Sequence, residues 1–251
     1  MRIEESAIRF IYLTDLCEDL LEQYRAAIND AFPPITQHSQ VIKKYWDRLE
    51  IYFPDHQIFM VEDDQKLLGF INTIPFFWDN ALEDLPDDGW DWMMKKGIVD
   101  FQNDITVNCL GGLQVIIPKE HQGKGYSKQI IAIAKTFVKN KEYDYLIIPI
   151  RPTFKSKFPE IKMEEYCQKK VGDKIYDPWI RTHLNSGAEI IKVCPNSMQV
   201  EGSLTFWEGI LGEKITGSGN YIAEGALNPV EIEVEKDYGV YHEENIWIYY
   251  G

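Results

Sequence analysis

One stretch of the sequence decides the fold: residues 118–127, PKEHQGKGYS. It follows an apolar run, LQVII at 113–117, and precedes apolar residues with helical spacing at Ile130, Ile131, Ala134, Phe137 and Val138. This order of strand, glycine loop and helix exposes backbone N–H groups at a helix N-terminus, where the helix dipole favours a phosphate. Gly123 and Gly125 permit backbone angles and a close ligand approach that a side chain would block. The stretch therefore predicts a phosphate-binding loop.

The spacing within this loop distinguishes it from two other glycine loops. The GxxxxGK[ST] pattern of a P-loop is absent, and the GxGxxG dinucleotide fingerprint is incomplete. The pattern Gln122-x-x-Gly125-x-Ser127, preceded by Ile116-x-Pro118, instead resembles motif A of the GCN5-related N-acetyltransferase (GNAT) superfamily, Q/R-x-x-G-x-G/A. Ser127 departs from that pattern, in which Gly or Ala is usual, but serine is small enough to fit. The alternative is a glycine turn that only caps a helix.

The resemblance implies acetyl-coenzyme A as a cosubstrate, with its pyrophosphate in the loop and its pantetheine arm along the preceding strand. One backbone N–H of that strand would polarise the thioester carbonyl, and transfer would be direct, in a ternary complex. Nothing in the sequence visibly activates Cys109 of the same strand as a nucleophile. The expected coenzyme A-binding residues are Gln114, Val115, Ile116, Gln122, Gly123, Lys124, Gly125, Tyr126 and Ser127.

The resemblance also suggests a candidate acid for the departing thiolate. Many GNAT enzymes carry a tyrosine four residues before a glycine in the last helix, within A-x-x-L-Y-x-x-x-G-F. The matching segment here is WIRTHLNSGA at 179–188, which places His183 at the tyrosine position. Histidine exchanges a proton near neutral pH, so His183 is the predicted catalytic residue. A helix histidine is equally compatible with a structural role, and the sequence identifies no general base.

Composition restricts the class of protein. The 251 residues, 45% of them hydrophobic, suit one large globular domain or a core with a small appendage. The sequence shows no apolar run of about 20 residues, so we expect no membrane partner. It also shows no secretory signal, and its four cysteines form no CxxC pair, so we expect a cytoplasmic protein. The histidines lack metal-ligand spacing, so no metal is expected. A net charge of −14 argues against nucleic acid as a partner.

Hydrophobic periodicity predicts an α/β (α+β) fold. The order resembles the GNAT fold, which implies a central mixed, mostly antiparallel twisted sheet flanked by helices. Residues 1–251 are expected to form a single domain, with insertions near 77–104 and 151–176 and a β-rich extension at 202–251. The expected strands are 8–13, 57–62, 66–75, 106–117, 145–150 and 189–193, and the expected helices are 16–29, 39–51, 127–139 and 178–185.

In this superfamily such additions usually build the acceptor site, so Trp78, Trp90 and Trp92 are candidates for its wall, with core packing as the alternative. The expected activity is transfer of acetyl from acetyl-CoA to a primary amine of a small molecule, by a monomer or homodimer. The alternatives are a longer acyl donor, a peptide amine as acceptor, and a non-catalytic coenzyme A sensor or scaffold. The sequence does not name the acceptor.

Overall fold

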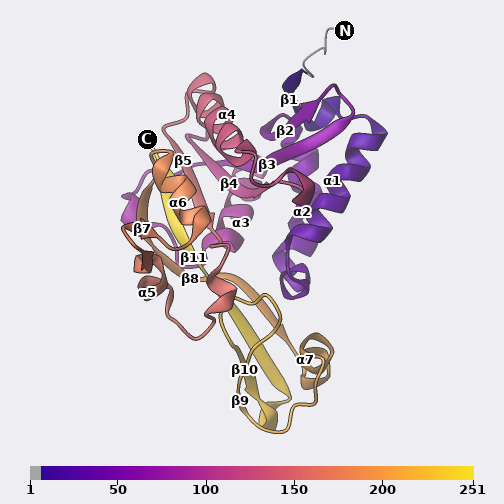
Figure 1. The fold of residues 1–251 in the computed structure, drawn as a ribbon, viewed down its shortest axis with the longest axis vertical. Helices are drawn as coiled ribbons and strands as arrows, with labels where there is room; N and C mark the ends of the chain where they lie inside the picture. Colours follow the sequence, from indigo (N-terminus) through magenta and orange to yellow (C-terminus); the bar gives the residue numbers. More distant parts are fainter. Residues whose placement is uncertain (1–6) are drawn as a thin grey trace.

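A computed structural model describes residues 7–251, and nine of the strands in this part of the chain form one sheet (Figure 1). The strand order is β1-β2-β3-β4-β5-β11-β10-β9, with β8 paired along β11. The β4–β5 pair is parallel, and the other strand pairs of this sheet are antiparallel. The strands are β1 Ile8–Tyr12, β2 Gln57–Glu62, β3 Lys66–Phe76, β4 Cys109–Ile116, β5 Tyr145–Ile150, β8 Glu189–Gly202, β9 Gly219–Tyr221, β10 Val230–Glu233 and β11 Tyr238–Tyr250.

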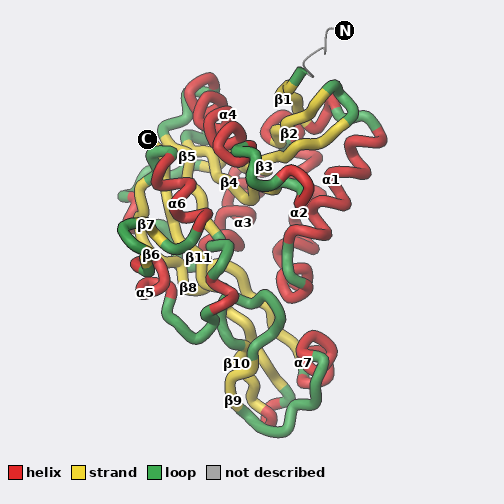
Figure 2. Tube along the Cα trace, viewed as in Figure 1, coloured by secondary structure: helices red, strands yellow, loops and turns green. Residues whose placement is uncertain are grey.

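Helices cover both faces of this sheet (Figure 2). The α-helices are α1 Glu18–Ala31, α2 Gln40–Tyr52, α3 Gly89–Gln102, α4 Tyr126–Asn140, α5 Met163–Gln168, α6 Pro178–Asn185 and α7 Leu204–Leu211. A small hairpin of β6 Lys170–Val171 and β7 Lys174–Ile175 lies between α5 and α6 in the sequence. The mixed, mostly antiparallel sheet flanked by helices confirms the predicted fold class.

The two faces of the sheet bury different hydrophobic clusters. On β11, Ile246 and Ile248 pack with residues of α4, α5 and α6, whereas Trp247 between them packs with residues of α2 and α3. Alternate residues of a strand point to opposite faces, so this change of partner follows from the pleat. α1 packs Leu20 and Tyr24 on the same side as α3, against the outer strands β2 and β3. Residues that alternate on β11 can therefore be assigned to one face or the other.

The extension lobe, residues 202–239, protrudes from one end of the sheet (Figure 1). The long ribbon of β8 and β11 connects it to the core, because β11 pairs with β10 in its first half and with β5 in its second half. The lobe has a small core around Trp207, which is fully buried. The sequence predicted a β-rich extension, and the structure adds the helix α7, which begins at the N-cap Ser203 and ends before Gly212 at φ 71°.

A buried histidine joins α6 to β11. Asp177 caps α6, since its Oδ1 accepts from the backbone N–H groups of Trp179 at 2.9 Å and Ile180 at 3.1 Å. His183 in the last turn is 0% exposed, and its Nδ1 lies 2.7 Å from the hydroxyl oxygen of Tyr250. Burial lowers the pKa of His183 to about 3, because the charged imidazolium would lose its hydration. The folded chain thus keeps His183 neutral.

This burial predicts a pH-dependent stability. The unfolded chain takes up a proton at His183 below about pH 6.5, whereas the folded chain does so only near pH 3, so stability falls as pH drops through this window. We expect His183 to lower the free energy of unfolding by up to about 2 kcal/mol between pH 7 and pH 5. Denaturant unfolding of the wild type and His183→Gln at both pH values measures the difference. Parallel pH profiles for the two proteins would contradict the prediction.

Candidate active site

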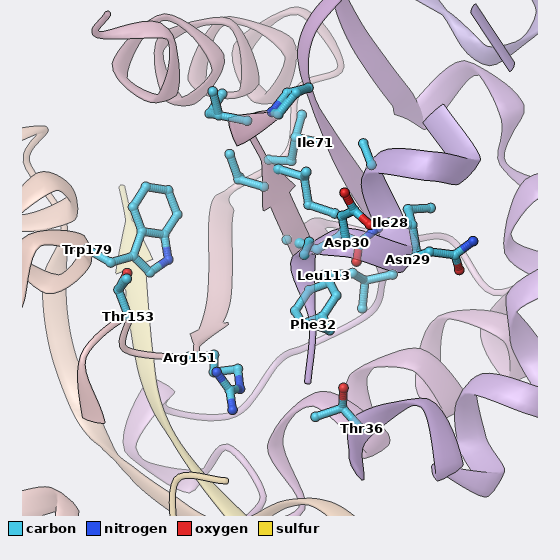
Figure 3. A pocket seen from close by; sticks show the side chains of 18 of the residues that line it. Ile28, Asn29, Asp30, Phe32, Thr36, Ile71, Leu113, Arg151, Thr153 and Trp179 are labelled. Atoms are coloured by element: carbon cyan, nitrogen blue, oxygen red, sulfur yellow. The ribbon is translucent and has the colours of Figure 1, made fainter. Parts of the chain in front are cut away.

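The parallel strands β4 and β5 separate along their length. Their pairing runs from Cys109 opposite Tyr145 to Gly111 opposite Ile147, after which both strands continue without pairing to each other. A cavity of about 850 Å³ opens there, lined by residues of both strands, by the end of α1 and by the start of α4 (Figure 3). This volume lies within the range of small-molecule sites. The strand separation therefore creates this cavity.

A β-bulge in β4 shapes the middle of this cavity. Gly112 pairs with Thr73 and Gln114 with Asn72, so Leu113 has no opposite residue on β3. The indole N–H of Trp90, in α3, donates to the carbonyl oxygen of Leu113 at 2.8 Å. Both Trp90 and Leu113 line the cavity and are buried. Trp90 of α3 therefore holds the bulge from one side.

A network of buried amides holds the bulge from the other side. The side chain of Gln114 donates to Asn72 at 2.7 Å, and Asn72 donates to Gln57 at 2.9 Å. Gln57 in turn binds the backbone of Thr73 through both its amide oxygen and its amide nitrogen. Asn72 and Gln57 are 0% exposed, so these bonds lie in a low dielectric and fix the register of β3 and β4.

The glycine loop lies at the rim of the cavity, between β4 and α4. Gly123 has φ 77° and Gly125, the N-cap of α4, has φ 83°. A Cβ atom added at either glycine would meet nothing within 4 Å, so the space beside both is open. The first N–H groups of a helix have no intrahelical acceptor and suit a phosphate oxygen. This geometry is the one predicted for the loop.

The predicted coenzyme A-binding residues fall into two groups. Gln114, Val115, Ile116, Gln122 and Ser127 line the cavity. Gly123, Lys124, Gly125 and Tyr126 form the loop beside it without lining it. The side-chain amide of Gln122 donates to the carbonyl oxygen of Ile117 at 3.1 Å, which ties the loop to the end of β4. The structure thus brings the two groups together at one end of the cavity.

Three groups with strongly shifted pKa values lie outside the cavity lining. His183 is enclosed between Trp179 and Tyr250, and this position does not support its predicted catalytic role, which stays a prediction. Burial raises the pKa of the Cys109 thiol to about 12, which disfavours a thiolate nucleophile. Burial also raises the pKa of the Asp91 carboxyl, in α3, to about 7.

Of the three candidate tryptophans, Trp90 lines the cavity. Trp78 and Trp92 contact each other with a ring distance of 5.5 Å, and Trp92 also contacts Phe76 and Trp247. Trp78 and Trp92 thus pack among other aromatic side chains, which fits the core-packing alternative for these two residues. Only Trp90 of the three combines burial with a hydrogen bond to the bulge.

Sequence reasoning missed the polar residues at the end of the cavity away from the glycine loop. Arg151, Glu243 and Asn245 line the wall there, and the end of α1 lines the opposite wall. The one available signal was the placement of Glu243 and Asn245 on the same face of the strand as Tyr241 and Trp247. Their partner Arg151 is 92 positions away, which no local pattern reveals.

Two further properties concern residues 7–251. The helices there lack the combination of length and apolar character needed to cross a membrane. This part of the chain contains no group of three or more His, Cys, Asp or Glu side chains placed to hold a metal ion.

Comparison with known proteins identifies one curated relative and several similar folds, although no protein-family model matches the chain. The arginine N-acetyltransferase avaD of Aspergillus versicolor is 25% identical over an alignment of 249 residues. The match covers 88% of this chain and 85% of that protein. The similarity therefore extends over most of both chains.

Two solved structures share the fold. The loading GNATL domain of CurA from Lyngbya majuscula has a TM-score of 0.54 and 18% identity, over 77% of this chain and 89% of that domain. The GphF GNAT-like decarboxylase in complex with isobutyryl-CoA has a TM-score of 0.57 and 11% identity, over 98% of each chain. With the glycine loop and the diverging strands, these similarities show that the chain has the fold of the GCN5-related N-acetyltransferases, and over most of its length it is similar to a named N-acetyltransferase.

Proposed function

We propose that this protein transfers an acetyl group from acetyl-CoA to the primary amine of a small molecule. The observation that carries the proposal is the cavity between β4 and β5, with the glycine loop at one end and a polar pocket at the other. The GphF relative of this fold is described with an acyl-CoA, and the curated relative is named for arginine, a small molecule with an amine. Arginine is therefore the first acceptor to test.

In the proposed reaction the cavity places the donor and the acceptor on opposite sides of the bulge. The pyrophosphate would bind at the start of α4 and the pantetheine arm would run along β4, with a backbone N–H near Leu113 directed at the thioester carbonyl. The neutral amine attacks the carbonyl carbon to form the C–N bond, the C–S bond breaks, and its electron pair stays on sulfur. The attacking nitrogen loses one proton and the thiolate takes up one, so the products are the amide and the free thiol of coenzyme A. No covalent enzyme intermediate is needed, in keeping with the raised pKa of Cys109.

The activity is tested by mixing the purified protein with acetyl-CoA and a panel of amines. The panel contains arginine, agmatine, lysine, spermidine and a short peptide, and the readouts are free thiol release and the mass of the product. We expect thiol release with a small amine and a product heavier by one acetyl group. Coenzyme A binding without thiol release for any amine would favour the sensor alternative, and faster transfer to the peptide would favour a peptide acceptor.

The coenzyme A loop is tested at Gly125. Gly125→Val puts a β-branched side chain at φ 83° and fills the open space beside the loop, so we expect at least a 10-fold loss of coenzyme A affinity in calorimetry. The matched control is Gly172→Val, because Gly172 has φ 59° and equally open space but lies in the β6–β7 turn. Both variants should lose about 1–3 kcal/mol of stability from backbone strain. Equal coenzyme A affinity in the two folded variants would remove the loop from the proposed site.

The bulge is tested at Trp90. Trp90→Phe keeps an aromatic ring but leaves the buried carbonyl of Leu113 without its donor, which costs about 1–3 kcal/mol of stability. A shift of the bulge by a fraction of an ångström would misplace the N–H groups, so we expect turnover to fall about 10-fold or more, with the KM for acetyl-CoA little changed. Trp92→Phe is the matched control, since this residue is in the same helix but outside the cavity lining. Equal turnover in both variants would contradict the role assigned to Trp90.

A further inference from the structure

A buried ion pair lies in the cavity wall formed by β5 and β11. Arg151 follows β5 directly, and its Nε donates to both carboxylate oxygens of Glu243, at 3.1 Å and 3.0 Å. The Nη2 of Arg151 donates to the carbonyl oxygen of Gly225 at 2.7 Å. The side chains of Arg151 and Glu243 are 22% and 2% exposed. These bonds hold the guanidinium in one orientation relative to the cavity.

The carboxylate of Glu243 has no capacity left for a ligand. Besides Arg151, it accepts from the hydroxyl of Tyr241 at 2.9 Å and from the amide nitrogen of Asn245 at 3.3 Å. A carboxylate offers about four lone-pair sites, and these bonds use all of them. Glu243 therefore positions Arg151, and a ligand in this part of the cavity would contact Arg151.

Arg151 retains unused donors. A guanidinium has five N–H groups, and residues 7–251 provide no acceptor for the two on Nη1. Arg151 lines the cavity, and in Figure 3 it lies on the other side of Phe32 from Asn29 and Asp30. A planar guanidinium with a free nitrogen pairs well with the oxygens of a carboxylate.

The position of this pair places it on the acceptor side of the cavity. Glu243, Asn245 and Trp247 alternate along β11, so they point to one face of the sheet. Trp90 and Leu113 belong to the same hydrophobic cluster as Trp247 and lie on that face, whereas α4 packs on the other. The glycine loop leads into α4, so the group that meets Arg151 is the acceptor rather than the pyrophosphate.

The opposite wall suits a positive charge. Asn29 and Asp30 lie in the last turn of α1, where the helix dipole is negative and no basic side chain is present. The two walls thus offer a cationic donor on one side and an acidic group on the other. A molecule that carries both a carboxylate and a cationic end would complement them.

We propose that the acceptor is a basic amino acid whose carboxylate binds Nη1 of Arg151 while its cationic side chain lies towards Asp30. This inference rests on the proposed acetyl transfer and specifies its substrate class. Arg151 is then a specificity-determining residue, since an amine without a carboxylate leaves its Nη1 without that partner in the cavity.

The test compares arginine with agmatine, which is arginine without its carboxylate, in a steady-state thiol-release assay. We expect the wild type to favour arginine by about 10-fold or more in kcat/KM, the scale of a lost charged hydrogen bond. Arg151→Lys keeps a positive charge for Glu243 but removes Nη1. It should lower kcat/KM for arginine about 10-fold, mainly through KM, and lower kcat/KM for agmatine by much less, with the KM for acetyl-CoA little changed.

Arg181→Lys is the matched control, because Arg181 also donates to a backbone carbonyl, that of Ile175, but lies outside the cavity lining. Should Arg151→Lys not fold, arginine amide still tests the idea in the wild type, where it should behave like agmatine. Equal rates with arginine and agmatine in the wild type, or equal losses for both in Arg151→Lys, would overturn this inference and leave the proposed function standing. Absence of thiol release with every amine would overturn both.

Discussion

The site depends on the separation of two parallel strands. β4 and β5 pair over three residues each and then diverge, so the backbone groups of their facing edges are left for a ligand. A strand edge without partners is costly unless something else satisfies it. The neighbours of each strand keep the two apart: β3 and the buried amides hold β4, α3 holds the bulge through Trp90, and β11 holds β5. The cavity is thus a consequence of rigid surroundings rather than of a flexible opening.

Much of the fold was predictable because its signals are local. The glycine loop, the apolar stripe of α4 and the apolar runs of β2 and β3 each lie within about fifteen residues, and these elements agree closely with the expected ones. Element ends were less predictable. The helix expected at 16–29 begins at Glu18, after a 3-10 turn at Leu13–Asp15, and it ends at Ala31. α7 escaped prediction because eight residues give only about two turns of periodicity.

The candidate site, like the fold, has one part that local sequence signals predict and another part that they do not. Residues next to the loop were predictable because a short motif carries them, whereas the acceptor end depends on contacts between distant segments. His183 illustrates the limit of a motif: its spacing to Gly187 matched, but the burial of that position depends on Trp179 and on Tyr250 of β11, which lies 67 positions away. A sequence pattern does not show which face of a helix becomes buried when a strand that is distant in the sequence packs against it.

The central place of β11 has a consequence for how this chain folds. β1 to β4 associate through neighbours in sequence, so this half of the sheet can form early. β5 cannot pair with β11, its second partner, at this stage, because β11 follows α6, β8 and the extension lobe in the sequence. Until β11 pairs with it, β5 presents an edge with the sequence YLIIPI, which is apolar and uncharged. Such an edge can pair with a strand of another chain. Misassembly between chains therefore competes with folding until β11 pairs with β5.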